Sequence, residues 1–177
     1  MTFIQATNYT VANRHRIDLV VLHSMESQEK PGTARGVAAW FASSAAPQAS
    51  AHYCLDAGEV VQCVHEHDIA WAAPGSNHNG IHIEHAGRAD QNACQWADDF
   101  SSAMLVRSIE LCAEICRRWN IPPAMLGPSA LIERARGITT HAAVTKAFRK
   151  STHTDPGPHF PLEYYCSRVA AKLKGIG

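Results

Sequence analysis

The chain has 177 residues, of which 46% are hydrophobic and 18% are charged, a composition typical of one packed globular domain and too apolar for a disordered chain. The 16 basic and 16 acidic side chains give a formal net charge of zero, which argues against binding nucleic acid or an anionic membrane through a basic surface. No apolar segment reaches the ~20 residues of a membrane span, and the N-terminal segment MTFIQATNYT lacks the features of a signal peptide, so we expect a soluble domain synthesised in the cytoplasm.

The first predicted elements are a strand and a helix. Residues 16–23 form an apolar, β-branched run that predicts a buried strand ending at His23. Residues 33–44 predict a helix, because Thr33 is a suitable cap and the apolar residues that follow share one face.

A hairpin and a second strand follow. Two short runs, residues 50–55 and 59–64, flank a turn at residues 56–58 and predict a β-hairpin. Residues 68–79 are rich in turn formers and predict a loop. Residues 80–85 (GIHIEH) alternate apolar and polar side chains, which predicts a strand with its polar set on one face.

The second half of the chain is predicted to be mainly helical. Apolar residues recur at helical spacing over residues 97–119, whereas residues 120–141 are expected to be irregular. Prolines and a glycine exclude regular structure from residues 151–161, and residues 162–173 predict a final amphipathic helix. Interleaved strands and helices, with one hairpin, predict an α/β fold with a mixed sheet.

Three polar residues lie where packing alone would not place them. His23 ends an apolar strand, and His141 and Asp155 lie in segments predicted to be irregular. Strand ends and rigid loops often carry catalytic groups, and two histidines with one carboxylate form a ligand set typical of catalytic zinc. Each histidine taken singly is equally compatible with an isolated hydrogen-bonding role.

A series of short motifs occurs along the chain, in this order: Val20–His23, Ser50–Tyr53 with Asp56–Gly58, Ala70–Ala72, Gly80–Glu84, Gly137–His141 and His153–Pro158. Together they resemble the motifs of the type 2 N-acetylmuramoyl-L-alanine amidases, zinc enzymes that are related to peptidoglycan recognition proteins and common in bacteriophage endolysins. The resemblance implies an α/β fold with a central mixed sheet flanked by helices, in a single domain over residues 1–177 with its core at about residues 17–165.

The resemblance implies that His23, His141 and Asp155 bind zinc (Zn²⁺). The implied reaction is hydrolysis of the amide bond between N-acetylmuramic acid and L-alanine in peptidoglycan, which lyses the cell wall. We expect peptidoglycan as the partner, with no nucleic acid and no membrane insertion, and a monomeric protein. The implied setting is a phage endolysin that a holin releases from the host cytoplasm, either as this chain alone or within a longer modular lysin.

Two further roles follow from the resemblance. Members of the family handle the attacking water with a tyrosine in the second motif or a glutamate in the fourth. The tyrosine position is Ala51 here, so Glu84 is the expected general base. Many relatives carry lysine two residues before the aspartate ligand, where this chain has His153, and we expect its imidazole to donate a hydrogen bond to the oxyanion.

Two other functions stay open at this stage. One is a peptidoglycan-binding module that keeps the fold without catalysis, although such relatives typically lose a metal ligand. The other is a zinc hydrolase of an unrelated amide. The His82-Ile83-Glu84 segment resembles part of a zinc deaminase motif, but no Pro-Cys-x-x-Cys follows it, which excludes that family.

The remaining histidines, tryptophans and cysteines are expected to be structural. His65 and His67 are predicted to be solvated, since no third ligand accompanies them. Trp40, Trp96 and Trp119 are expected in the core, whereas Trp71 lies in a turn-rich loop and could stack on a sugar. The six cysteines include no Cys-x-x-Cys pair, and we expect six structural, unlinked thiols, with Cys112 and Cys116 as small buried residues of a helix.

Overall fold

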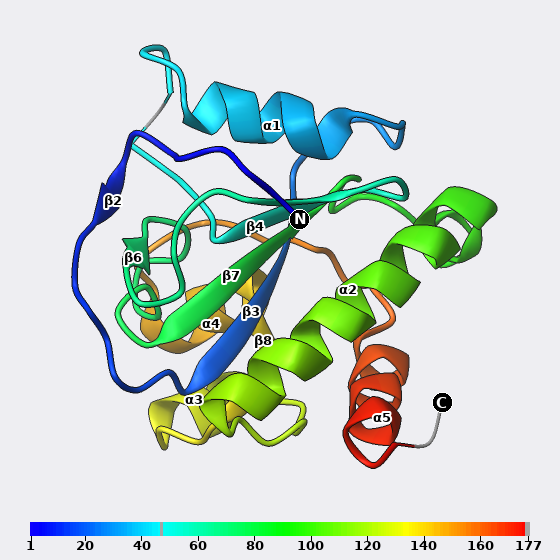
Figure 1. The fold of residues 1–177 in the computed structure, drawn as a ribbon. Helices are drawn as coiled ribbons and strands as arrows, with labels where there is room; N and C mark the ends of the chain where they lie inside the picture. The colour runs from blue at the N-terminus through cyan, green and yellow to red at the C-terminus, as the bar shows by residue number, and fades with distance from the viewer. Residues whose placement is uncertain (47, 176–177) are drawn as a thin grey trace.

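The computed structural model describes residues 1–46 and 48–175 and contains a six-stranded sheet with helices on both faces (Figure 1). β4 and β5 pair antiparallel, as the hairpin prediction requires, and all other neighbours in this sheet pair parallel. The predicted α/β class with a central mixed sheet is therefore confirmed. In sheet order, the strands are β1 (Thr2–Phe3), β5 (Val60–Gln62), β4 (Tyr53–Leu55), β7 (Gly80–His85), β3 (Leu19–Ser24) and β8 (Gly137–Thr140).

The helices form two layers around the sheet. One layer contains the long α2 (Asp99–Trp119), which crosses the sheet diagonally, and α5 (Leu162–Leu173) beside it (Figure 1). The other layer contains α1 (Thr33–Phe41), which packs on β4 and β5, and α3 (Pro128–Ile132) with α4 (His141–Phe148), which pack on β3. The predicted boundaries of α2 and α5 are confirmed to within two residues.

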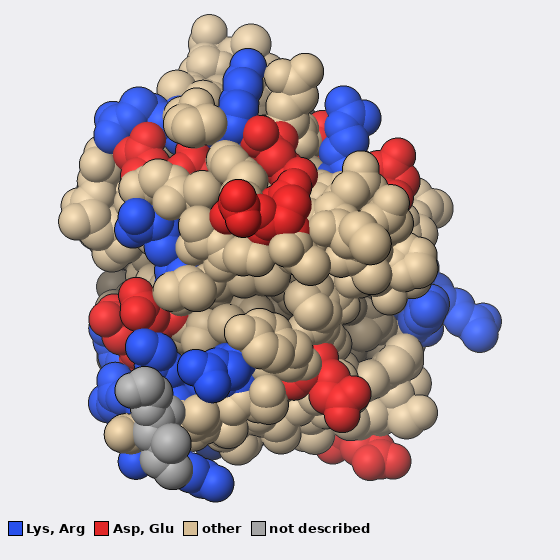
Figure 2. Space-filling model, turned by 90° about the vertical axis from the view of Figure 1, so that its right-hand side faces the viewer, with Lys and Arg blue, Asp and Glu red and all other residues tan. Residues whose placement is uncertain are grey.

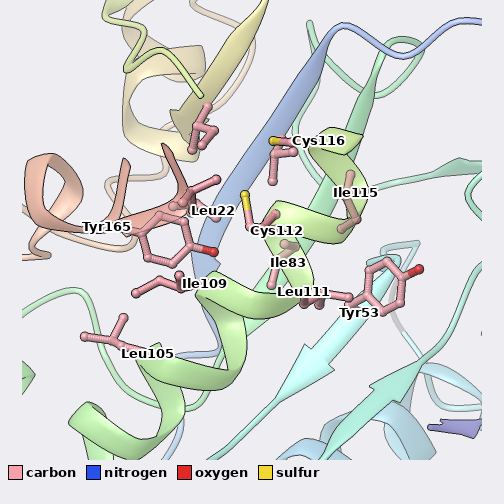
Figure 3. Close-up of a cluster of buried hydrophobic side chains, with 14 of the residues drawn as sticks. Leu22, Tyr53, Ile83, Leu105, Ile109, Leu111, Cys112, Ile115, Cys116 and Tyr165 are labelled. Carbon is pink, nitrogen blue, oxygen red and sulfur yellow. The ribbon is translucent and has the colours of Figure 1, made fainter. Parts of the chain in front are cut away.

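The alternation of side chains along β3 and β7 places the largest hydrophobic cluster on one face of the sheet and His23, His82 and Glu84 on the other. Val20 and Leu22 of β3 pack with Ile81 and Ile83 of β7 against α2 and α5, in the cluster of buried side chains that Figure 3 shows. The alternate residues of both strands therefore point toward the α1 and α4 layer. His23 belongs to this second set.

The start of α1 differs from the sequence prediction. Its N-cap is Gly32, which has no side-chain cap, and the Thr33 hydroxyl donates instead to the Gln28 carbonyl. Asp56, a fully buried residue in the turn between β4 and β5, caps the helix instead. Its Oδ2 accepts hydrogen bonds from the backbone N–H groups of Gly32 and Ala34. The prediction that Thr33 caps this helix was wrong.

Several short elements escaped the sequence prediction. α3 and β8 lie within residues 120–141, where the chain was expected to be irregular, and α4 follows over residues for which no element was predicted. β8 pairs along the outer edge of β3. β6 (Ile69–Ala70) lies within the predicted loop and pairs with β2 (Tyr9–Thr10) in a separate two-stranded sheet. These segments are too short to show a period, and their pairing partners are distant in sequence.

The cysteines are unlinked, as expected. All six cysteines are free thiols, and five are buried, but Cys94 is exposed. On the side of the molecule that carries α2 and α5, acidic and basic side chains are interspersed among neutral ones (Figure 2). No helix in the described part of the chain is long and apolar enough to cross a membrane.

Candidate metal centre and active site

The candidate site lies at the carboxyl ends of three neighbouring parallel strands. His23 is near the end of β3, Glu84 is its register partner in β7, and His141 directly follows β8 as the first residue of α4. Crevices outside the carboxyl ends of parallel strands are where open α/β sheets bind their ligands. The β7–β3–β8 order thus brings together side chains that the sequence separates widely.

Asp155 reaches this edge from the loop after α4. The backbone carbonyl of Asp155 accepts a hydrogen bond of 2.9 Å from the Ala142 N–H, which ties the loop to the first turn of α4. Two residues further on, Gly157 has φ +90° and packs so closely on the Ala89 carbonyl that a Cβ atom would clash with it. The loop is therefore fixed on both sides of the carboxylate.

The imidazoles of His23 and His141 face the same carboxylate. His23 Nδ1 lies 3.1 Å from Asp155 Oδ2, and His141 Nδ1 lies 3.1 Å from Asp155 Oδ1. His23, His141 and Asp155 each offer one ligand atom, and these three atoms all lie within 4.8 Å of one another. All three residues are buried. Two imidazole nitrogens and one carboxylate oxygen are a donor set that suits zinc.

The protonation states of these groups favour metal binding. Burial lowers the pKa of His23, although the neighbouring Asp155 carboxylate opposes that shift. Burial would raise the pKa of Asp155, but its contacts with His141 and His23 hold that pKa well below its usual range. A neutral imidazole and an ionised carboxylate are the forms that bind a metal ion.

Each imidazole has a polar neighbour at its other ring nitrogen. His23 Nε2 lies 3.1 Å from His82 Nδ1, and His141 Nε2 lies 3.4 Å from the Ser151 hydroxyl. Ser151 in turn lies 2.5 Å from the Thr145 hydroxyl. Neither His82 nor Ser151 was identified from the sequence, although the alternation along β7 already placed His82 on the same sheet face as Glu84.

Glu84 lies at the floor of the site. Its Oε1 is 3.8 Å from His23 Nδ1, and its Oε2 is buried and has no hydrogen-bond partner among the residues that the structure describes. Burial raises the pKa of Glu84 well above its ordinary value, and the negative charges of Asp155 and Glu26 add to the effect. The sequence alone left open an outward-facing carboxylate, whereas the structure places it beside His23.

His153 lies at the rim of the site. Its ring stacks on the ring of His141 with centroids 4.4 Å apart, and its Nδ1 lies 3.3 Å from Asp155 Oδ1. Its side chain is 63% exposed, so one edge of the ring is accessible to a ligand in the cleft. All five residues that the sequence singled out therefore lie in one place.

A cleft of about 390 Å³ extends from these residues toward α1. Trp40 and Trp71 both line it. Trp40 is 48% exposed, which contradicts its predicted place in the core. Trp71 is partly buried, and its indole N–H donates to the Thr10 hydroxyl at 2.9 Å.

The other expected structural residues lie outside the cleft. Trp96 is buried in the core, and Trp119 packs at its edge. His65 and His67 are exposed, as predicted, with their rings against Phe3 and Trp119 respectively.

Sequence comparison identifies one matching family. The family described as N-acetylmuramoyl-L-alanine amidase matches residues 13–158 of the chain. N-acetylmuramoyl-L-alanine amidase A from Achromobacter lyticus is 32% identical over 93% of this chain and 89% of its own length.

Solved structures share the fold at lower sequence identity. The Staphylococcus aureus hydrolase AmiA, solved in complex with its ligand, has a TM-score of 0.74 at 15% identity and covers 99% of this chain and 85% of its own. The N-acetylmuramoyl-L-alanine amidase LysC from Clostridium intestinale has a TM-score of 0.61 at 16% identity, with coverage of 98% and 96%. At these identities the likeness establishes the fold.

Proposed function

The chain belongs to the N-acetylmuramoyl-L-alanine amidase family, and we propose that it is a zinc-dependent member that hydrolyses the bond between N-acetylmuramic acid and L-alanine and thereby lyses cell walls. Family membership supports amidase activity on peptidoglycan. The observation that carries the zinc-dependent proposal is the convergence of His23, His141 and Asp155 beside Glu84. Residues 1–177 form one catalytic domain in this proposal, with the core at about residues 17–165.

Zinc, when bound by His23, His141 and Asp155, supplies Lewis acidity that polarises the scissile carbonyl and lowers the pKa of water. The donor atoms fit that role because they converge at a buried site that opens into the cleft. Asp155 Oδ1 faces the Nδ1 atoms of His141 and His153 at 3.1 and 3.3 Å but has hydrogen-bond geometry to neither, and a cation held between these atoms would satisfy the buried carboxylate oxygen.

Glu84 is the general base in this mechanism. Its carboxylate accepts a proton from the attacking water and passes it to the amine of the departing L-alanine. Burial and nearby acidic groups raise its pKa, which moves the carboxylate toward the neutral range in which a shuttle both accepts and releases a proton. The residue lines the cleft beside the proposed metal ligands, which is where the attacking water would lie.

His153 supports the charge that develops on the carbonyl oxygen. Its ring stacks on His141 at the rim of the cleft, where an imidazole N–H can donate a hydrogen bond to the oxyanion. Trp40 and Trp71 offer flat apolar surfaces along the same cleft, which suits the ring faces of a sugar. We further propose that the protein acts as a monomer.

The endolysin setting belongs to the same proposal. A second amidase of the same fold, LysCS from Clostridium intestinale, is described as an endolysin. We propose that this chain likewise degrades the bacterial wall during phage lysis, after release from the host cytoplasm through a holin.

The decisive experiment is mass spectrometry of purified peptidoglycan after digestion. New lactyl carboxyl groups on N-acetylmuramic acid and free amines on L-alanine are the expected products. Neither product should form after the enzyme is treated with a chelator, and both should form again when zinc is added back. Binding to peptidoglycan without either product would indicate a non-catalytic binding module. Cleavage of a different amide, or full activity in a zinc-free preparation, would contradict the proposed reaction or its zinc dependence.

A further inference from the structure

His82 is a buried histidine that the proposed reaction does not use. It lies in the middle of β7, two residues before Glu84, and is fully buried. Its side chain points toward the same face of the sheet as His23, and its Nδ1 lies 3.1 Å from His23 Nε2. A second histidine, His52, stacks on it with ring centroids 5.6 Å apart and planes 14° from parallel.

We propose that His82 is a positioning residue, whose Nδ1 accepts a hydrogen bond from the Nε2–H group of His23 and so leaves His23 Nδ1 free to bind the metal. The inference rests on the proposed zinc site. It adds a function for a side chain that touches neither the metal-binding atoms nor the cleft.

The chemistry of the imidazole ring sets the direction of this hydrogen bond. A neutral histidine carries its proton on one nitrogen only, so a ring that offers Nδ1 to a metal must carry the proton on Nε2. A buried N–H group needs an acceptor, and His82 Nδ1 is the partner that His23 Nε2 has. Metal-bound histidines generally donate their second N–H in this way.

The surroundings of His23 make the acceptor important. On the metal side, Asp155 Oδ2 lies 3.1 Å from His23 Nδ1 and attracts the proton to that nitrogen. That tautomer would block metal binding. His82 offers an acceptor at the opposite nitrogen and therefore stabilises the competing, metal-binding tautomer.

His82 is itself held in place from two sides. His52 Nδ1 accepts a hydrogen bond of 3.0 Å from the backbone N–H of His82. The backbone N–H of His52 in turn donates to the backbone carbonyl of His82 at 3.1 Å. Gly80 packs so closely that an added Cβ would lie 3.2 Å from His82 Nε2. The ring's one contact with a polar side-chain atom is at Nδ1, since Nε2 has no hydrogen-bond partner in the described structure. When Nδ1 accepts from His23, the proton of His82 lies on this unpaired Nε2, so it is the metal at His23 Nδ1 that selects this direction of the hydrogen bond over the reverse one.

The test compares four variants with wild type in zinc affinity, measured by competition with a chromophoric chelator. His82→Leu removes the acceptor, whereas His82→Asn keeps the same branched shape and places an amide oxygen near the position of Nδ1. His82→Gln keeps the amide but moves its oxygen one bond further along the side chain. Tyr53→Phe is the control, because it removes another buried polar group, the hydroxyl that donates to Glu66, without contacting His23.

We expect His82→Leu and His82→Gln to bind zinc about 10- to 100-fold more weakly, and His82→Asn and Tyr53→Phe to stay within a few-fold of wild type. In the zinc-loaded wild type and His82→Asn proteins, NMR should show the hydrogen-bonded Nε2–H proton of His23 at low field. Should His82→Leu not fold, as judged by circular dichroism, the His82→Asn and His82→Gln pair makes the same comparison.

Equal zinc affinity in wild type, His82→Leu and His82→Gln would overturn the positioning role and leave the zinc site intact. Equal affinity in the Asn and Gln variants, when His82→Leu does not fold, would do the same. A wild-type protein that binds no zinc would instead contradict the proposed function on which the inference rests. The affinity and NMR measurements need no substrate, so they separate metal positioning from catalysis.

Discussion

Glu84 and His23 are register partners in β7 and β3, and the Glu84 carboxylate lies 3.8 Å from His23 Nδ1. The pairing places a carboxylate against the candidate metal centre without making it one of the three converging ligands. Because Glu84 also lines the cleft, its carboxylate is available to a reacting water.

The first prediction concerns this carboxylate. Glu84→Gln keeps the shape of the side chain but cannot accept a proton, so kcat on peptidoglycan should fall by roughly 10²- to 10⁴-fold while zinc stays bound. Glu110→Gln, a change at an exposed residue paired with Lys172 on the far layer, is the control and should keep the wild-type rate. A zinc-loaded Glu84→Gln enzyme with near-normal kcat would return Glu84 to a structural role.

The second prediction concerns the metal ligands. Elemental analysis of the purified protein should find close to one zinc per chain, and His141→Ala or Asp155→Asn should reduce zinc content and activity together. Asp90→Asn alters an exposed carboxylate and should change neither. An active preparation without zinc would contradict this assignment.

The third prediction concerns His153. His153→Ala removes the hydrogen-bond donor at the rim and should lower kcat by roughly 10²- to 10³-fold. His153→Lys restores a donor and should recover most of that loss. Zinc content, measured in the same preparations, distinguishes oxyanion binding from support of Asp155. If His153 only supports Asp155, the alanine variant should bind less zinc, and its zinc-loaded form should keep the wild-type kcat.

The fourth prediction concerns Asp56, which links the hairpin turn to α1. Its Oδ1 accepts from the N–H groups of Gly58 and Glu59, while its Oδ2 accepts from those that begin the helix. Asparagine can replace one oxygen but not both, so Asp56→Asn should lower the free energy of unfolding by about 3 kcal/mol. In urea titrations, Asp98→Asn should cost far less, because asparagine caps a helix as well as aspartate does.

The fifth prediction concerns stability in acid. Burial lowers the pKa of His85 to about 4, whereas a histidine in an unfolded chain titrates near ~6.5. Below that pH the unfolded chain takes up a proton that the folded chain refuses, so the free energy of unfolding should fall as the pH drops from about 6.5 to about 4. Below the folded pKa the contribution of His85 is fully lost.

Urea titrations of zinc-free protein at several pH values measure this slope. Replacing His85 by glutamine should reduce the slope by about 1.4 kcal/mol per pH unit within that window. The exposed His65 serves as the control, and His65→Gln should leave the slope unchanged. An unchanged slope in His85→Gln would show that the buried ring is already protonated in the folded protein.

The sequence predicted the elements whose patterns are long or strongly apolar. The helix at residues 99–119 and the strand at residues 19–24 repeat their apolar positions often enough to set both type and face. β8 has four residues and pairs with β3 more than 100 residues away, so nothing local marks it as a strand.

The candidate site was predictable as a set of residues but not as an arrangement. Motif order pointed to His23, His141 and Asp155, and the structure brings them together. The role of His82 depends on which neighbour lies across the sheet, and strand order is a property of the whole fold. Trp40 was misassigned because a helical apolar face can border an open cleft as well as a core.

The position of β3 between β7 and β8 also has a consequence for synthesis of the protein on the ribosome. Both hydrogen-bonding edges of this buried strand are covered by partners that begin at residues 80 and 137. A nascent chain that stops short of residue 137 therefore leaves one edge of an apolar strand open to pairing with other chains. Translation products truncated before that point should aggregate, and native structure should appear only when most of the chain has left the exit tunnel.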